Sequence, residues 1–264
     1  MRLPFFDASA MIGNTIPPLP EPLPDARALL GEMDHFGIER TLFFAYRFAP
    51  EGAAAINAAT LAAAKVSDRL APCWVLQTSP DTIGENLKSE ADRIVAGGAR
   101  AARLFPSEGP SASPLPLRPY LIGDILAGLE RFRIPLLVPE SLLNLAQLGA
   151  GAYDPIDQIC SAYPRLPMVI LEPRYNSAPL LVPLMARHKA LYATITLFGL
   201  YRQLESLSAM VGPERLLFGT GLPHFDASIA TGMLLYSGLP PKTLEMIAGG
   251  NLRRLLADAG REAK

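Results

Sequence analysis

Cysteine is scarce in this chain, which has only Cys73 and Cys160 among its 264 residues. The two lie far apart, in apolar or helical surroundings, so each is predicted to be a buried free thiol, with a disulfide the less favoured alternative. The scarcity excludes a small scaffold held together by disulfides and fits a reducing compartment. We therefore expect a cytoplasmic protein.

Long apolar runs and an excess of charge of one sign are also missing. No uninterrupted apolar stretch approaches the ~18 residues of a membrane-spanning helix, and no basic segment followed by an apolar one opens the chain. The formal net charge is -1, so no strong overall field attracts nucleic acid or anionic lipid. These absences argue against membrane and nucleic-acid partners.

What the chain does have is an alternation of short apolar runs with amphipathic stretches, and half of its residues are hydrophobic. The apolar runs lie within 2–13 and at 41–46, 72–77, 101–105, 134–138, 168–171, 191–195 and 215–219. Their spacing is that of βα units, and a chain of this length is close to the ~250 residues of an eight-fold barrel. We predict an α/β fold, a single (β/α)8 TIM barrel over residues 1–264. An open doubly wound sheet is the alternative, but no glycine-rich phosphate turn follows the first run.

Four stretches together resemble the amidohydrolase-related group of metal-dependent TIM-barrel hydrolases and decarboxylases. Residues 30–40 (LGEMDHFGIER) are similar to its "MDxxGI" passage, and 215–224 (RLLFGTGLPH) to its "R(I/L)LFGSDxP" eighth strand. Residues 163–171 (YPRLPMVIL) resemble its sixth strand, and 247–256 (IAGGNLRRLL) its closing helix. The resemblance covers essentially the whole chain and implies the same barrel fold.

The departures from the family pattern that matter most fall at the positions that perform its chemistry. Members of the family usually hold a divalent metal through two histidines after strand one and others after strands five and six, with an aspartate base after strand eight. The matching positions here are Ser9, Met11, Pro139, Pro173 and Gly221. A catalytic zinc needs about three His, Asp, Glu or Cys ligands, and two of the three histidines, His35 and His188, fall in helical stretches. We expect no metal and no other cofactor.

Charged and aromatic residues instead follow the predicted strands, where active sites of barrels are built. Arginine binds carboxylates through its planar guanidinium group, which can donate two parallel N–H hydrogen bonds. Carboxylates and histidine can transfer protons. The predicted substrate-binding residues are Arg47, Arg103, Arg174, Tyr46, Tyr175 and Asp7. The predicted catalytic residues are His224, Asp226, Glu172 and Glu140.

Structural roles are open for several of these residues. Glu140 and Glu172 have the opposite alternation parity to the vacated histidine positions, so regular strands would point both away from the barrel lumen. Arg103 would serve equally well as a counter-ion inside the barrel. Asp7 would serve to accept hydrogen bonds from neighbouring amides, and His224 would lie on the surface.

Two functions follow from this pattern. The first is a metal-free hydrolysis, lactone opening or decarboxylation of a small carboxylated substrate, since buried arginines are costly without an anionic partner. The second is a catalytically inactive relative that binds a metabolite or a protein, because the positions of the family's chemistry are changed. The resemblance also implies a homodimer.

Overall fold

Eight parallel strands follow one another around a barrel in the order β1 to β8. The computed structural model describes residues 3–14, 18–46, 52–76, 90–104, 117–143 and 149–262. The strands are β1 Phe5–Ile12, β2 Ile38–Ala45, β3 Leu70–Leu76, β4 Ala101–Leu104, β5 Leu136–Pro139, β6 Met168–Leu171, β7 Leu191–Thr194 and β8 Leu216–Leu217. The predicted (β/α)8 TIM barrel is confirmed.

Backbone hydrogen bonds between β1 and the chain that follows β8 bring the two ends of the sheet together. The amide of Ala8 donates to the carbonyl of Phe218 over 3.0 Å, and that of Gly221 to the carbonyl of Ser9 over 2.9 Å. The strand β1 extends beyond Asp7 to Ile12, with its register against β2 shifted between Asp7 and Ala10. Ser9 is therefore part of a strand at the rim.

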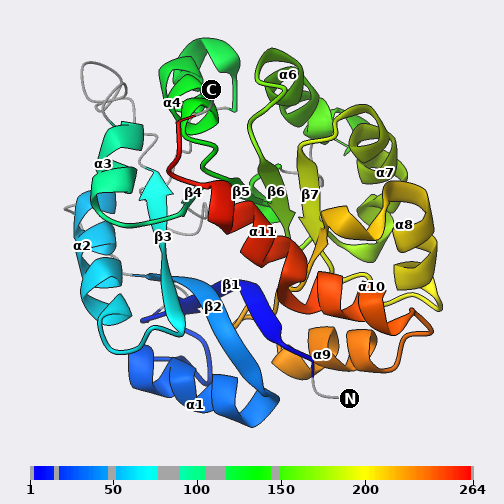
Figure 1. Cartoon of the computed structure of the whole chain (residues 1–264), viewed down its shortest axis with the longest axis horizontal. Coiled ribbons are helices and arrows are strands. Elements are labelled where there is room, and N and C mark those ends of the chain that lie inside the picture. Colours follow the sequence, from blue (N-terminus) through cyan, green and yellow to red (C-terminus); the bar gives the residue numbers. More distant parts are fainter. Residues whose placement is uncertain are drawn as a thin grey trace.

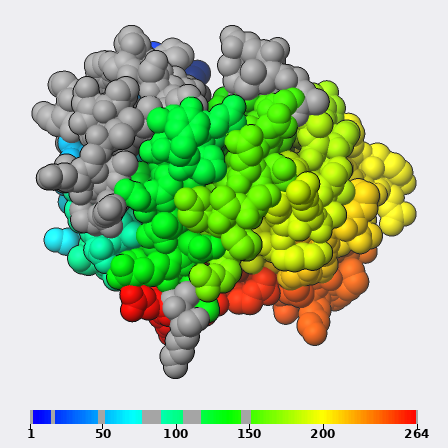
Figure 2. Space-filling view, turned by 90° about the horizontal axis from the view of Figure 1, so that it is seen from above, coloured from blue at the N-terminus to red at the C-terminus, as the bar shows by residue number. Residues whose placement is uncertain are grey.

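Helices surround the barrel, as Figure 1 shows. The α-helices are α1 Ala26–Phe36, α2 Ala53–Ala64, α3 Glu90–Ala96, α4 Pro119–Arg131, α6 Asp154–Ala162, α7 Ala178–Arg187, α8 Gln203–Val211, α9 Ala227–Leu235, α10 Pro241–Glu245 and α11 Asn251–Asp258. The short helices are η2 Glu140–Leu143, η3 Gly149–Tyr153, η4 Tyr175–Ser177, η5 Pro213–Arg215 and η6 Met246–Gly250. Figure 2 shows α4, α6 and α7 forming part of a continuous outer wall.

Local sequence accounts for several of these boundaries. Asp25 caps α1 by accepting hydrogen bonds from the amides of Arg27 and Ala28, and Gly37 ends the helix in the left-handed conformation with φ 68°. These are the expected start and stop signals of a helix. The strands β5 and β6 are buried along their whole length, as parallel strands between a core and a helical layer must be.

The last helix, α11, lies across the ring of strands in Figure 1. Its Leu252 and Leu255 pack against inward-facing strand residues such as Phe6 and Leu137. The guanidinium of Arg253 donates to the carbonyl of Pro4, just before β1. The helix therefore closes the end of the barrel where the strands begin, and the opposite end is left for a site.

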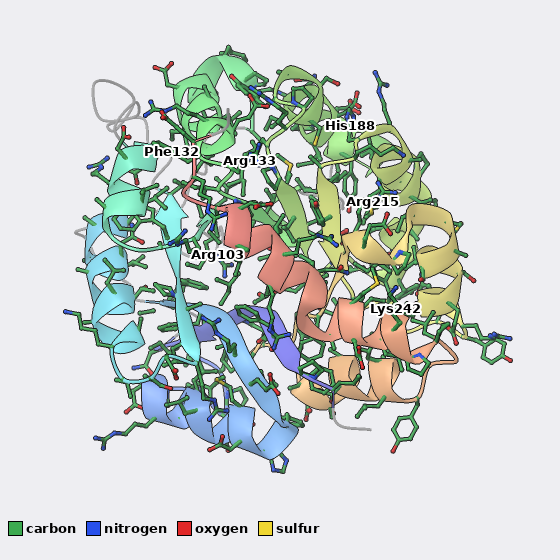
Figure 3. The ribbon with its side chains drawn as sticks, viewed as in Figure 1. Arg103, Phe132, Arg133, His188, Arg215 and Lys242 are labelled. Carbon is green, nitrogen blue, oxygen red and sulfur yellow. The ribbon has the colours of Figure 1, made fainter. Side chains whose placement is uncertain are left out.

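Arg215, from the stretch that resembles the family's eighth strand, has a structural role. Its buried guanidinium donates to the carbonyls of Met185 and Val211, at the ends of α7 and α8. A cation at the carbonyl end of a helix satisfies acceptors that have no partner within the helix. Figure 3 shows Arg215 on the helix side of the sheet, away from Arg103.

Both cysteines are buried and unbridged, as predicted. Within the described parts of the chain, no helix has the length and apolar character needed to cross a membrane.

Candidate functional site

A cavity of about 190 Å³ opens at the carboxyl ends of the strands. It is lined by Ser9, Ala10, Met11, Phe44, Arg103, Pro139, Ser141, Glu172, Arg174, Gly221, Leu222, His224 and Phe225. Six of these lining residues are polar or charged, and polar groups that converge on a concavity are typical of small-molecule sites. Four of the ten predicted site residues, Arg103, Arg174, Glu172 and His224, come together here.

Arg103 supplies a buried cation to this cavity. It lies in the middle of β4 with only 6% of its surface exposed, and Figure 3 places it within the ring of strands. Its guanidinium carbon is 3.9 Å from the centre of the Phe44 ring. A cation over an aromatic face is stabilised by about 2 kcal/mol when it is desolvated. Phe44 therefore stabilises the Arg103 guanidinium at the cavity, which both residues line.

Glu172 follows β6 and turns into the cavity through an unusual backbone conformation. Its φ is 54°, a left-handed value that costs a residue with a Cβ about 1–2 kcal/mol. Its amide donates to Oγ1 of Thr194 over 2.8 Å, and its Oε1 accepts a 2.6 Å hydrogen bond from Oγ of Ser9. The regular alternation that would point Glu172 outward is thus broken at this residue.

Glu140 has the same sequence relation to β5, but its side chain is engaged outside the cavity. It begins η2, is 3% exposed, and accepts hydrogen bonds from the hydroxyl of Tyr153 over 2.5 Å and the amide of Arg174 over 3.0 Å. Burial and the neighbouring Glu140 raise the pKa of the Tyr153 hydroxyl well above its ordinary range. Glu140 therefore anchors the backbone that presents Arg174.

Asp7 is fully buried beneath the cavity and organises its floor. Its Oδ1 accepts hydrogen bonds from the amides of Ser9 and Thr220 over 3.0 and 2.8 Å. Its Oδ2 accepts from the hydroxyls of Thr220 and Thr41 over 2.7 and 3.1 Å. Burial raises the pKa of this carboxyl to about 6, and the hydrogen bonds partly oppose that rise. Asp7 thus joins β1, β2 and the segment after β8, and it does not line the cavity.

Gly221 makes room for the other groups on the rim. Its φ is 71°, and a Cβ placed there would come within 2.6 Å of the Phe225 ring and 3.4 Å of Cγ of Glu172. The chain then turns through a cis peptide bond between Leu222 and Pro223. This turn brings the exposed His224 to the cavity edge.

The remaining predicted site residues lie elsewhere. Tyr46 is buried in an apolar cluster with Met11 and Phe44, and Tyr175 lies at the surface beyond the cavity. Asp226 caps α9 by accepting a hydrogen bond from the amide of Ser228. Hydrogen bonds from the side chain and the amide of Ser228 hold the pKa of the Asp226 carboxyl below its usual range. Arg47 lies outside the described residues.

With this geometry established, comparison with known proteins identifies the family. A profile described as "Amidohydrolase" matches residues 19–257. The chain belongs to the amidohydrolase family. No curated protein sequence matches it at a significant level.

Solved structures share the fold of this amidohydrolase at low sequence identity. The 2,6-dihydroxybenzoate decarboxylase from Rhizobium has a TM-score of 0.73 at 17% identity, covering 97% of this chain and 99% of that one. A dihydroxybenzoic acid decarboxylase from Polaromonas, with bound manganese and 2-nitroresorcinol, has 0.73 at 14%, covering 97% of each chain. The 4-oxalomesaconate hydratase from Rhodopseudomonas palustris has 0.71 at 15%, covering 96% of each.

The amidohydrolase family implies a divalent metal, and the described residues do not fit one. Of the five ligand and base positions predicted from the family pattern, Ser9, Met11, Pro139 and Gly221 line the cavity without offering an imidazole or carboxylate. Across the described ranges, no three His, Cys, Asp or Glu side chains gather closely enough to hold a metal ion. The donor set falls short of the about three ligands that zinc requires.

The hydroxyl groups that build this site were not among the residues predicted from the sequence. Ser9 was considered only as a lost ligand, yet it bonds Glu172, and Thr220 and Thr194 were not selected although they hold Asp7 and the Glu172 backbone. The one local signal for Thr220 and Thr194 is a hydroxyl residue at the end of an otherwise apolar run. That signal is weak because threonine is common in strands.

Proposed function

We propose that this amidohydrolase acts, without the family's metal, on a small carboxylated substrate by hydrolysis, lactone opening or decarboxylation. Arg103 and Arg174 bind the substrate carboxylate, and Glu172 and His224 move protons. The observation that carries the proposal is the cavity itself, because two guanidinium groups, a carboxylate and an imidazole line the space where the predicted metal-ligand positions offer no ligands. Decarboxylases and a hydratase of carboxylated compounds on the same fold support the substrate class.

Arg103 and Arg174 have different roles in binding the anionic substrate. Arg103 is buried and held against Phe44, so it is preorganised and its charge acts in a region of low dielectric. Arg174 is exposed at the rim, with its backbone fixed by Glu140. We assign Arg103 the inner contact with the substrate carboxylate and Arg174 the capture of anions at the entrance.

Glu172 and His224 provide two proton-transfer groups of different accessibility. Ser9 directs the Glu172 carboxylate, and the exposed His224 can exchange protons with solvent. General acid–base catalysis by such positioned groups contributes about 10²–10⁴-fold to a rate. The buried, unbridged thiols favour a reducing location such as the cytoplasm. The homodimer that the resemblance implies stays a prediction.

Small carboxylates should raise the melting temperature through Arg103. At a concentration about a hundred times Kd, binding adds about 2.7 kcal/mol, which is a Tm rise of roughly 5–10 °C for a chain of this size. A thermal-shift series with acetate, succinate and benzoate, against chloride at matched ionic strength, measures this effect in the wild type and in Arg103→Gln. Arg187→Gln, which removes an exposed arginine on α7, is the matched control and should keep the full rise. An equal rise in Arg103→Gln would refute the assignment.

Protein purified without chelator should contain no stoichiometric zinc, manganese or iron. The physical reason is the shortage of ligands in the cavity. Elemental analysis by mass spectrometry provides the test, with a metal-binding member of the family purified in parallel as the positive control. About one metal ion per chain, retained through gel filtration, would show that the metal-free part of the proposal is wrong.

A further inference from the structure

We propose that Ser9 is a catalytic nucleophile and Glu172 its general base, so that the cavity hydrolyses esters or lactones through an acyl-enzyme. This inference rests on the proposed function for its location, and it goes further by selecting one reaction class. The two side chains come from β1 and from the residue after β6, which lie far apart in the sequence. The fold brings them to a 2.6 Å hydrogen bond in which the serine hydroxyl is the donor.

The position of Ser9 is set on both sides by the backbone. Its amide donates to Oδ1 of Asp7 over 3.0 Å, and its carbonyl accepts the amide of Gly221 over 2.9 Å. The residue is only 4% exposed, yet it lines the cavity. With its backbone held on both sides and its hydroxyl bonded to Glu172, Oγ of Ser9 points in one direction, which is how a nucleophile is preorganised.

Glu172 is held in place for the role of base. Its left-handed backbone, with φ 54°, is maintained by the hydrogen bond from its amide to Thr194. Backbone strain of this kind persists where the surrounding structure holds it, and it is concentrated at functional sites. A nucleophile within hydrogen-bond reach of a base that a third group orients is the arrangement found in covalent catalysis.

The reaction balances with the groups in the cavity. Oγ of Ser9 attacks the carbonyl carbon of the ester or lactone while its proton passes to the Glu172 carboxylate. Arg103 and Arg174 line the same space, and the positive charge that binds the substrate carboxylate also stabilises the carbonyl oxygen as it becomes negative. The bond to the alcohol oxygen breaks, and that oxygen takes the proton from Glu172. Water then attacks the acyl carbon, Glu172 takes its proton, and Oγ of Ser9 leaves and is reprotonated.

Covalent labelling of the purified full chain tests the assignment. A fluorophosphonate and p-nitrophenyl acetate are each incubated with the protein, and the modified residue is located by peptide mass spectrometry. We expect one adduct per chain, on Ser9, with labelling lost in Ser9→Ala and slowed at least tenfold in Glu172→Gln. Ser141 also lines the cavity. Ser206→Ala, which removes an exposed serine on α8 outside the cavity, is the matched control and should be labelled at the wild-type rate.

Labelling of the wild type alone can refute the proposal, so the test does not depend on whether the variants fold. No adduct with either probe, or an adduct on Ser141 rather than Ser9, refutes the nucleophile. A rate in Glu172→Gln equal to the wild type refutes the base. The carboxylate-dependent rise in Tm is measured on the same preparations. A carboxylate-dependent rise in Tm without labelling refutes the Ser9 nucleophile and supports the anion site. Labelling of Ser9 without a rise in Tm refutes the anion site and supports the nucleophile.

Discussion

Replacing Asp7 by alanine is expected to lower the free energy of unfolding by about 4 kcal/mol. The substitution leaves the amides of Ser9 and Thr220 without the oxygen that accepts both of them. Each buried donor that loses its partner costs about 1–3 kcal/mol, and the missing carboxyl group leaves a void in the wall. Urea denaturation at pH 7, monitored by circular dichroism, measures the loss.

Asp7→Asn is the matched control, because the amide side chain has nearly the same shape. Its oxygen can accept from both backbone amides, and its NH₂ group can donate to the hydroxyl oxygens of Thr41 and Thr220. Those hydroxyls have carbonyls within reach, of Leu42 at 3.1 Å and of Ser9 at 3.4 Å. Because the amide mimics the protonated carboxyl, we expect the Asn variant to be within about 1 kcal/mol of the wild type near pH 4 and no less stable than the wild type at pH 7. A loss equal to that of the alanine variant would mean that the negative charge, rather than the hydrogen bonds, is what the site needs.

The stability of the wild type relative to Asp7→Asn should fall as the pH rises from about 4 to about 7. The carboxyl of Asp7 has an ordinary pKa of 3.8, and burial raises it to about 6 in the folded protein. Between these values the folded chain keeps a proton that the unfolded chain has released, so a higher pH favours unfolding. Since each pKa unit corresponds to about 1.4 kcal/mol, the total change is about 3 kcal/mol.

Measuring the difference between the two variants removes the other titrating groups, which are common to both. Urea midpoints taken at half-unit steps of pH should give a difference that is flat below about pH 4 and above about pH 7. A difference that does not change over this range, or that moves in the wild type's favour as the pH rises, would contradict the buried-proton account.

The fold was largely predictable because its signals are local and repeated. The apolar runs, the Asp25 cap and the Gly37 stop each depend on a few neighbouring residues, and the same unit recurs along the chain. The matching order of four family stretches gave the amidohydrolase assignment, which the profile over residues 19–257 confirms. The extension of β1 to Ile12 was less evident, because small residues after Asp7 are equally common in turns.

The site was predictable in its residue types but not in its arrangement. Arg103, Arg174, Glu172 and His224 were selected as strand-end residues and do line one cavity. Asp226, chosen on the same grounds, caps a helix, and Asp7 bonds to threonine and serine groups below the cavity floor. A position directly after a strand does not determine whether the side chain points into the cavity or accepts a hydrogen bond from a neighbouring backbone amide.

Glu140 and Glu172 show most clearly where sequence and tertiary structure divide. Both directly follow a buried strand and have the same place in its inward–outward alternation. The sequence alone therefore determined only that proline occupies the metal-ligand positions and that a glutamate lies next to each proline. The contact of Glu172 with Ser9 joins residues 163 positions apart, and that of Glu140 with Arg174 joins residues 34 apart. Only the closed barrel brings these partners together, and it thereby turns one carboxylate into the cavity and holds the other in the wall.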